Sequence, residues 1–466
     1  MEKNSAYKNL KKIYLDYAAS TPVAHEVKRA MDPYFFDIFG NPGSLHSFGQ
    51  KAMAAVDAAR ETIGKAIRAD FREVIFTSGA TEANNLVLRG IVADFRRKHA
   101  DSRGSSFGVS PRKVSVDLRP RLIVSAIEHE SVLDTAYALE QEGIEVVVLP
   151  VDAKGIVDLK KLEAALDSRT VLVSVMYVNN EIGSVQPITK ISEMIRNFRK
   201  ESGIRNQKPR IRNKELGIRN GESAAPNSKF LIPNSRFPLF HTDAAQAFEY
   251  FSCDVEKLGI DLMTLSSQKI YGPKGAGALY IRNQESGIQN GNAIIPNSRF
   301  LIPSITGGGQ EFGLRSGTEN VSAIAGFGEA ARLAERVRTK NAKKVTEMKE
   351  YFWNELKKIY PRALINGNQE SGIRNKRKSE MAPHILNVYF PTEFAGDLLI
   401  KMDMAGIAAS SGSACSAHSF TPSHVLEAVG LPSERVRGSV RFSFGTPTTK
   451  REIKEALRRT KKILNA

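Results

Sequence analysis

Residues 262–282 read LMTLSSQKIYGPKGAGALYIR, two apolar strand-like runs joined by a polar turn. The first run ends in small polar residues and Lys269, directly before Tyr-Gly-Pro. Similar apolar runs lie upstream, and helical stretches follow them, as after EVIFTSG (73–79) and RLIVSAIEHE (121–130). Continuous apolar strands with helical crossovers predict an α/β fold with a mostly parallel sheet sandwiched between helices.

Polar side chains follow five of these strands at the point where each strand ends. Ligands of parallel sheets bind beyond the carboxyl ends of the strands, so a single pocket is predicted there. The five groups are Ser78 to Thr81, Glu128-His129, Asn179-Asn180, His241 to Asp243, and Ser266 to Lys269.

The length of 466 residues exceeds the usual size of a single hydrophobic core. The strand–helix alternation restarts late in the chain, with ILNVYF, AGDLLIKMDMAG and VRFSFG. We predict a large domain over 14–338 and a smaller C-terminal α/β domain over 339–466, which the N-terminal segment 1–13 joins.

Four stretches are predicted to be loop insertions, at about 96–121, 201–238, 282–304 and 368–380. Two of them hold 19-residue copies of one sequence, ELGIRNGESAAPNSKFLIP and ESGIQNGNAIIPNSRFLIP. Their Asn, Ser, Gly and Pro content and lack of a steady period favour surface loops without function, with a basic docking surface as the alternative. The four stretches carry +14 of the formal charge of +17, so nucleic-acid binding is not expected.

The composition excludes several classes of protein. Two cysteines, Cys253 and Cys415, cannot form a disulfide framework or a multi-cysteine zinc site, and no metal is expected. No apolar run reaches the roughly 18–20 residues that span a bilayer, and the N-terminus lacks the apolar core of a signal peptide. We therefore expect a cytoplasmic protein that does not enter a membrane.

The predicted pocket combines residue types that together suit one cofactor. Thr81, in TSGATE at a helix start, is suited to a phosphate, although the same pattern is also an ordinary helix cap. Asp243 ends an apolar strand without a nearby cation, and a protonated ring nitrogen would satisfy it. His129 could stack on a ring or be a core histidine. With Lys269 to form a Schiff base, this set describes a pyridoxal 5′-phosphate site.

The motifs in their order along the chain resemble those of the cysteine desulfurases, which are class-V aminotransferase-like enzymes of fold type I. The resemblance runs from about residue 13 to 447. QKIYGPKG and SSGSAC are its most specific motifs. The others are YLDYAAST, FGNPGSLHSFG, FTSGATEANN, EHESV, VNNEIGSVQP, HTDAAQ, GGGQEFGLRSGTEN and VRFSFG.

The resemblance implies a role for each matching residue. Lys269 would hold the cofactor, Asp243 would pair with its ring nitrogen, and His129 would stack on the ring and transfer protons. Gln246 and Asn180 would bond near its phenolic oxygen, and Arg441 together with Asn180 would bind the substrate. The phosphate would be held by Ala80, Thr81, Ser266, Gln268 and, from a neighbouring subunit of a homodimer, Thr318.

Cys415, in the Ser- and Gly-rich loop 410–424, would attack the sulfur of L-cysteine, keep it as a persulfide and release alanine. The loop sequence resembles the group that passes sulfur to an iron–sulfur scaffold or to thiolation acceptors, in which Cys415 would transiently contact a nascent cluster. Gln268 stands where this family usually has histidine.

Two other interpretations remain open. A selenocysteine lyase or another class-V lyase or aminotransferase would keep the cofactor without strictly needing Cys415. A non-catalytic scaffold or nucleic-acid-associated protein would use the basic insertions instead.

Overall fold

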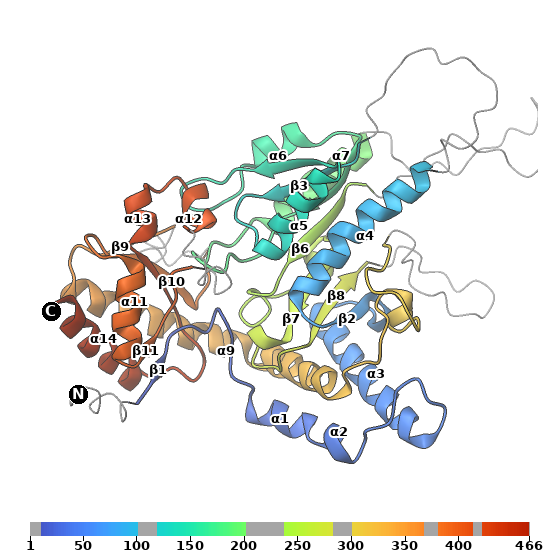
Figure 1. Ribbon diagram of the computed structural model, residues 1–466, viewed down its shortest axis with the longest axis horizontal. Helices are drawn as coiled ribbons and strands as arrows, with labels where there is room; N and C mark the ends of the chain where they lie inside the picture. The colour runs from blue at the N-terminus through green and yellow to red at the C-terminus, as the bar shows by residue number, and fades with distance from the viewer. Residues whose placement is uncertain are drawn as a thin grey trace, which may run out of the picture.

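A seven-stranded sheet forms the centre of the computed structural model, which describes residues 11–100, 119–201, 237–282, 301–367, 381–412 and 422–465 (Figure 1). Its strand order is β2-β8-β7-β6-β5-β3-β4. The strands are β2 (Val74–Thr77), β3 (Arg121–Ser125), β4 (Glu145–Leu149), β5 (Thr170–Ser174), β6 (Leu239–Asp243), β7 (Leu262–Ser266) and β8 (Gly277–Ile281).

The predicted mostly parallel sheet is confirmed, and β8 is its antiparallel strand. The segment between β7 and β8 is too short for a helical crossover, so the chain turns back on itself. This turn is the stretch that carries Lys269, and it begins with the short helix η2 (Ser267–Lys269).

Helices cover both faces of the sheet. Successive residues of a strand point to opposite sides, so a continuous apolar strand makes both faces apolar and each must be covered. In β3, Leu122 and Val124 pack with α4 (Ala80–Ala100) and α5 (Glu130–Gln141). Ile123 belongs to the core on the other face. That core also takes in side chains of α3 (Ser47–Ile67), α6 (Leu159–Ala165), α7 (Ile188–Glu201), α8 (Val255–Leu258) and the start of α9 (Val321–Ile359).

A second, smaller core lies around an antiparallel sheet of order β12-β10-β9, drawn in orange and red in Figure 1. Its strands are β9 (Leu364–Ile365), β10 (Ile385–Tyr389) and β12 (Ser439–Ser443), and its helices are α11 (Ala395–Met404) and α14 (Lys450–Leu464). At the N-terminus, β1 (Ile13–Tyr14) pairs in parallel with β11 (Ile407–Ala408).

The 39-residue helix α9 connects the two cores. Its residues up to Ala334 pack in the large core, and those from Val345 pack in the small core. The predicted domain boundary at 338/339 falls inside this helix, and the division into domains stays a prediction. Most of each predicted insertion lies outside the described residues. Cys415 also lies outside them.

The remaining helices are short. They are α1 (His25–Met31), α2 (Pro33–Phe36), α12 (His424–Ala428), α13 (Ser433–Arg437) and the short turns η1 (Phe71–Glu73) and η4 (Glu311–Gly313). In the part of the chain that the structure describes, no helix combines the length and apolarity needed to cross a membrane.

Candidate active site

A cavity of about 280 Å³ lies at the carboxyl end of the sheet, where the sequence predicts a pocket. Most of its lining comes from the part of the chain around the large sheet, and Arg441 comes from β12 of the smaller sheet. The cavity brings together ten of the twelve predicted site residues: Ala80, Thr81, His129, Asn180, Asp243, Gln246, Ser266, Gln268, Lys269 and Arg441.

Lys269 reaches into this cavity from the turn after β7. Its Nζ donates to the carbonyl oxygens of Ala18 and Ala19, at 2.7 Å each. Thr21 holds the turn, because its Oγ1 donates to the Gln268 carbonyl (2.9 Å) and accepts from the Tyr271 amide (2.8 Å). Tyr271 itself has a φ of +64°, a conformation that non-glycine residues adopt only when their surroundings hold them there. The lysine is thus fixed on a rigid support.

A chain of hydrogen bonds links Asp243 to His129. Asn84 Nδ2 donates to Asp243 Oδ2 and to Ser131 Oγ, at 2.8 Å each. The Ser131 amide donates to His129 Nδ1 (3.1 Å), where the imidazole caps α5. Since Nδ1 accepts this bond, the neutral ring carries its hydrogen on Nε2. One network therefore orients both the carboxylate and the imidazole.

Asp243 is 5 % exposed, and the donors that the structure shows for it are neutral. Besides Asn84, the Ala245 amide donates to its Oδ1 (2.9 Å). A buried carboxylate gains most from a cationic hydrogen-bond donor. The site can thus accept a protonated heterocyclic nitrogen.

Residues Ser78 to Thr81 line the cavity at the N-terminus of the 21-residue helix α4. Gly277 of β8 packs against Gly79 so closely that a Cβ on Gly277 would lie 2.6 Å from Gly79 Cα. Glu82 accepts from the Ser78 amide (2.9 Å) and from Arg315 Nε (3.1 Å). Burial opposes ionisation of Glu82, but these bonds outweigh it and lower the pKa of its carboxyl group. Glu82 thus takes up the Ser78 amide, while the N-terminal end of the helix at Ala80 and Thr81 suits an anion.

Arg441 of β12 is 1 % exposed, although its guanidinium lines the cavity. Its Nη1 donates to the Asn180 carbonyl (2.9 Å), and its Nη2 pairs with Asp16 Oδ1 (2.8 Å). Its Nε has no hydrogen-bond partner among the described residues. An unsatisfied buried guanidinium N–H next to a cavity suits a carboxylate ligand.

The other two predicted site residues lie elsewhere. Thr318 is exposed and is not among the residues that line the cavity, so its predicted contact with a neighbouring subunit stays a prediction. Cys415 lies outside the described residues.

Not every polar residue at a strand end belongs to the pocket. His241 lies inside the core, with Nδ1 at 2.8 Å from Ser174 Oγ and Nε2 at 3.0 Å from Thr264 Oγ1. Burial lowers the pKa of His241 to about 4, so the ring is neutral. Asn179 is also buried, and its Oδ1 accepts from the amides of Glu181 and Ile182. Both residues are structural.

Sequence reasoning did not single out Asp16, Asn84, Ser131 and His384, which contact residues of this site. The first three stand inside motifs that carry the family resemblance, and Asn84 lies one helical turn after Thr81, a spacing that could have indicated it. His384, described below, gives no comparable signal because its contact partners are distant in the sequence.

Comparison with known proteins gives consistent results. The family model described as aminotransferase class-V matches residues 13–101, 111–201 and 233–456. A protein of Dictyoglomus turgidum named cysteine desulfurase IscS is 36 % identical over 96 % of this chain and 93 % of its own length. Another of that name, from Proteus mirabilis, is 39 % identical over 96 % of this chain and 91 % of its own.

Solved structures agree with these relatives. One described as a NifS-like protein has a TM-score of 0.76 at 28 % identity and covers 98 % of this chain and all of its own. A second, described as SspA in complex with cysteine, has a TM-score of 0.67 at 32 % identity, over 94 % of this chain and all of its own. Residues 102–110 and 202–232, which the family model leaves unmatched, fall within two of the predicted insertions.

Proposed function

The chain belongs to the class-V aminotransferase family, and from this we propose that it is a cysteine desulfurase that takes sulfur from L-cysteine and releases L-alanine. The observation that carries the proposal is the arrangement of Lys269, Asp243 and Arg441 around one cavity. The solved relative described with bound cysteine supports the choice of substrate.

The cavity fits pyridoxal 5′-phosphate, the cofactor of this family. Asp243 is a buried carboxylate beside neutral donors, the α4 N-terminus suits an anion, and Lys269 lines the same cavity. When bound, the cofactor supplies a ring that withdraws electrons from the carbon next to the substrate amino group.

Each residue then has a role that follows from its chemistry. Lys269 would hold the cofactor covalently, and Asp243 would accept a hydrogen bond from its ring nitrogen. Ala80, Thr81, Ser266 and Gln268 would hold its phosphate. Asn180 and Gln246 would face its phenolic oxygen.

His129 would stack on the ring and move a proton at Nε2, because its Nδ1 is occupied as the cap of α5. Arg441 would bind the substrate carboxylate, since it lines the cavity and its guanidinium suits a planar anion.

Sulfur transfer is assigned to Cys415. Its thiolate attacks the substrate sulfur, so that an S–S bond forms while the substrate Cβ–S bond breaks. The electron pair stays on the carbon side, which takes a proton and leaves as L-alanine. The persulfide sulfur then passes to an acceptor thiol, and we propose an iron–sulfur scaffold or another sulfur-acceptor protein in the cytoplasm. Such a scaffold would bring a nascent cluster into transient contact with Cys415.

The second enzyme candidate, a selenocysteine lyase, shares the cavity and differs in its need for Cys415. We propose the desulfurase because SSGSAC supplies that thiol, at a position in the sequence between β11 and α12.

The test uses purified protein and two matched pairs of variants. Wild type is expected to absorb at about 400 nm and to release alanine and sulfide from L-cysteine. Lys269→Ala should abolish this absorption and lower activity at least about a thousandfold, whereas Lys274→Ala, an exposed lysine five residues along, should retain both.

The cysteine pair separates the two enzyme candidates. Cys415→Ser should stop persulfide formation, which alkylation and mass spectrometry detect, whereas Cys253→Ala at a buried core position should not. A colourless protein that is inert with added pyridoxal 5′-phosphate would refute the proposal. Full sulfur release by Cys415→Ser would favour the lyase.

A further inference from the structure

Gln246 has both ends of its side-chain amide engaged at the wall of the active-site cavity. Its Nε2 donates to the Ala18 carbonyl (2.9 Å), and its Oε1 lies 3.1 Å from His384 Nε2. The Ala18 carbonyl can only accept, so the amide end facing it must be the NH₂ group. Because Oε1 then faces His384, the imidazole must carry its hydrogen on Nε2.

His384 is held firmly in this orientation. It is 3 % exposed and stacks on Tyr250, with ring centroids 4.5 Å apart and planes inclined by 27°. The Phe444 amide donates to its carbonyl (2.8 Å), which ties it to the residue after β12. Its Nδ1 has no partner among the described residues, as suits the bare nitrogen of a neutral ring.

The electrostatic surroundings keep the ring in this neutral form. Burial lowers the pKa of His384 to about 3, and the positive charges of Lys349, Arg441 and Lys269 act in the same direction. The ring is therefore neutral at pH 7, with its Nε2–H directed toward Gln246.

The Ala18 carbonyl connects this pair to the lysine. The same oxygen accepts from Gln246 Nε2 and from Lys269 Nζ. A rotated Gln246 amide would place Oε1 against the Ala18 oxygen, and the repulsion would displace the amide, the Ala18 segment or both. His384 is the group that opposes this rotation.

We propose that His384 is a positioning residue for the cofactor site: it fixes the Gln246 amide in one orientation and, through Ala18, the place of Lys269. The proposal rests on the proposed function, because it assigns Gln246 a role beside pyridoxal 5′-phosphate. His384 directly precedes β10 of the smaller sheet and stacks on Tyr250 of the smaller core, so this support comes from the junction of the two cores.

The test measures the dissociation constant of pyridoxal 5′-phosphate for the apoprotein by fluorescence titration. His384→Phe keeps a ring to stack on Tyr250 and removes the donor, and His384→Gln restores an amide donor near the position of Nε2. The Phe variant should bind about tenfold more weakly, the loss expected for one hydrogen bond, and the Gln variant within about threefold of wild type.

A double-mutant cycle distinguishes positioning from general stability. In a Gln246→Ala background, His384→Phe should add less than about twofold, because the amide that it orients is gone. Thermal unfolding of the apoproteins reports separately on folding. If the Phe variant folds poorly, His384→Leu, which also removes the donor, takes its place in the cycle with Gln246→Ala.

Two results would overturn the inference while leaving the proposed function intact. One is unchanged cofactor binding in His384→Phe when wild type binds normally. The other is an equal loss with and without Gln246. If wild type itself fails to bind the cofactor, the proposed function fails as well.

Discussion

At the scale of single residues, Glu128 shows how position decides protonation. It precedes His129 in the sequence, yet it is fully buried, and its Oε1 accepts from the Ser125 hydroxyl and from the Met176 amide. Burial raises the pKa of Glu128 to about 8. The two hydrogen bonds lower this pKa, and the negative charge of Asp243 raises it. Glu128 is therefore largely neutral at pH 7.

This pKa predicts a pH-dependent stability. Below about pH 4.5 Glu128 is protonated in both the folded and the unfolded state. Between about pH 4.5 and 8 Glu128 ionises only in the unfolded chain. Rising pH in this range therefore lowers the free energy of unfolding by up to about 1.4 kcal/mol per pH unit. Glu128→Gln removes this dependence. Urea unfolding of both apoproteins at pH 5, 6.5 and 8 should show wild type losing stability relative to the variant as pH rises. A constant difference would contradict the assignment.

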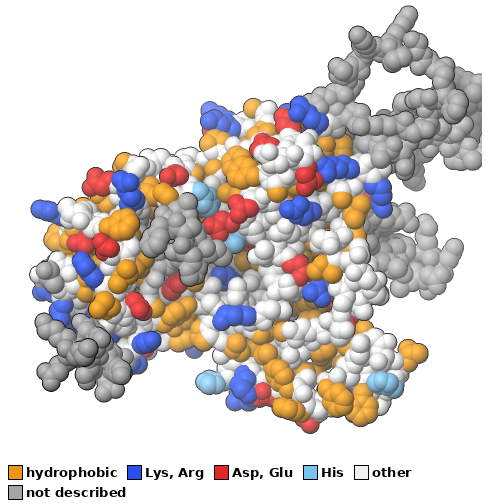
Figure 2. Space-filling model, viewed as in Figure 1, with side chains coloured by type: hydrophobic (Ala, Val, Ile, Leu, Met, Phe, Trp, Pro, Cys, Tyr) orange, Lys and Arg blue, Asp and Glu red, His pale blue; other side chains and the backbone are white. Residues whose placement is uncertain are grey.

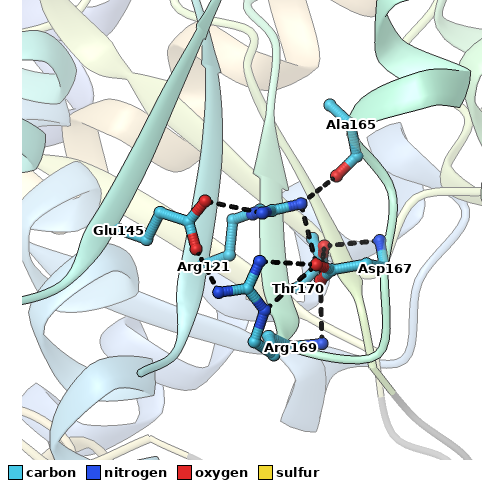
Figure 3. A network of polar contacts seen from close by, with 6 residues as sticks. All are labelled: Arg121, Glu145, Ala165, Asp167, Arg169 and Thr170. Atoms are coloured by element: carbon cyan, nitrogen blue, oxygen red, sulfur yellow. Dashed lines mark hydrogen bonds and ion pairs between the residues drawn. The ribbon is translucent and has the colours of Figure 1, made fainter. Parts of the chain in front are cut away.

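At the scale of elements, an ion-pair network joins the amino ends of three strands (Figure 3). Arg121 of β3 donates to Glu145 of β4 (2.6 Å) and pairs with Asp167 (2.9 Å), just before β5. Arg169 pairs with the same two carboxylates, at 2.6 and 2.8 Å. Arg121 also donates to the Ala165 carbonyl at the end of α6 (2.7 Å). The network lies at the edge of the sheet away from the cavity, so we assign it to stability.

Arg121→Met should therefore destabilise the protein by about 1–2 kcal/mol, because it removes one of the two arginines that pair with the partly buried carboxylates and takes the Arg121 donor from the Ala165 carbonyl. Lys28→Met is the control, since the Lys28–Asp32 pair has side chains 67 % and 48 % exposed and should contribute about 0–0.5 kcal/mol. Denaturant unfolding measures both, and cofactor binding should not change in either. An Arg121→Met loss no larger than the control would contradict the network's role.

At the scale of the whole molecule, an apolar surface lies over α2 and the start of α3 (Figure 2). Its exposed side chains are Phe35, Phe36, Phe39, Leu45 and Phe48, with exposed fractions from 50 % to 92 %. Contiguous exposed apolar side chains of this size mark interaction surfaces. They support the proposed homodimer, in which Thr318 would reach the neighbouring cofactor.

We predict that the double variant Phe36→Asp, Leu45→Asp weakens dimerisation at least tenfold in sedimentation equilibrium, because each aspartate replaces an apolar side chain that the partner would bury. Activity should fall with dimer content. Ile400→Asp, at a 59 % exposed position on α11, is the matched control and should remain dimeric. A wild-type monomer with full activity would exclude the proposed role of Thr318.

The sequence alone was sufficient for the fold class and for most of the cavity. Apolar runs followed by helices specify a buried parallel sheet through local periodicity, and strand ends meet at one edge whatever the details of packing. Asp243, His129 and Lys269 were therefore predictable as neighbours from their places at successive strand ends.

Only the tertiary structure decided which polar groups face the cavity and what holds them. His241 and Asp243 lie on the same face of β6. His241 lies two residues further from the carboxyl end of the strand, and it is covered by Ser174 and Thr264. The pairs Asp16–Arg441 and Gln246–His384 join residues 425 and 138 positions apart. Contacts at such separations depend on how the two cores pack around α9, and no local pattern in the chain records that packing.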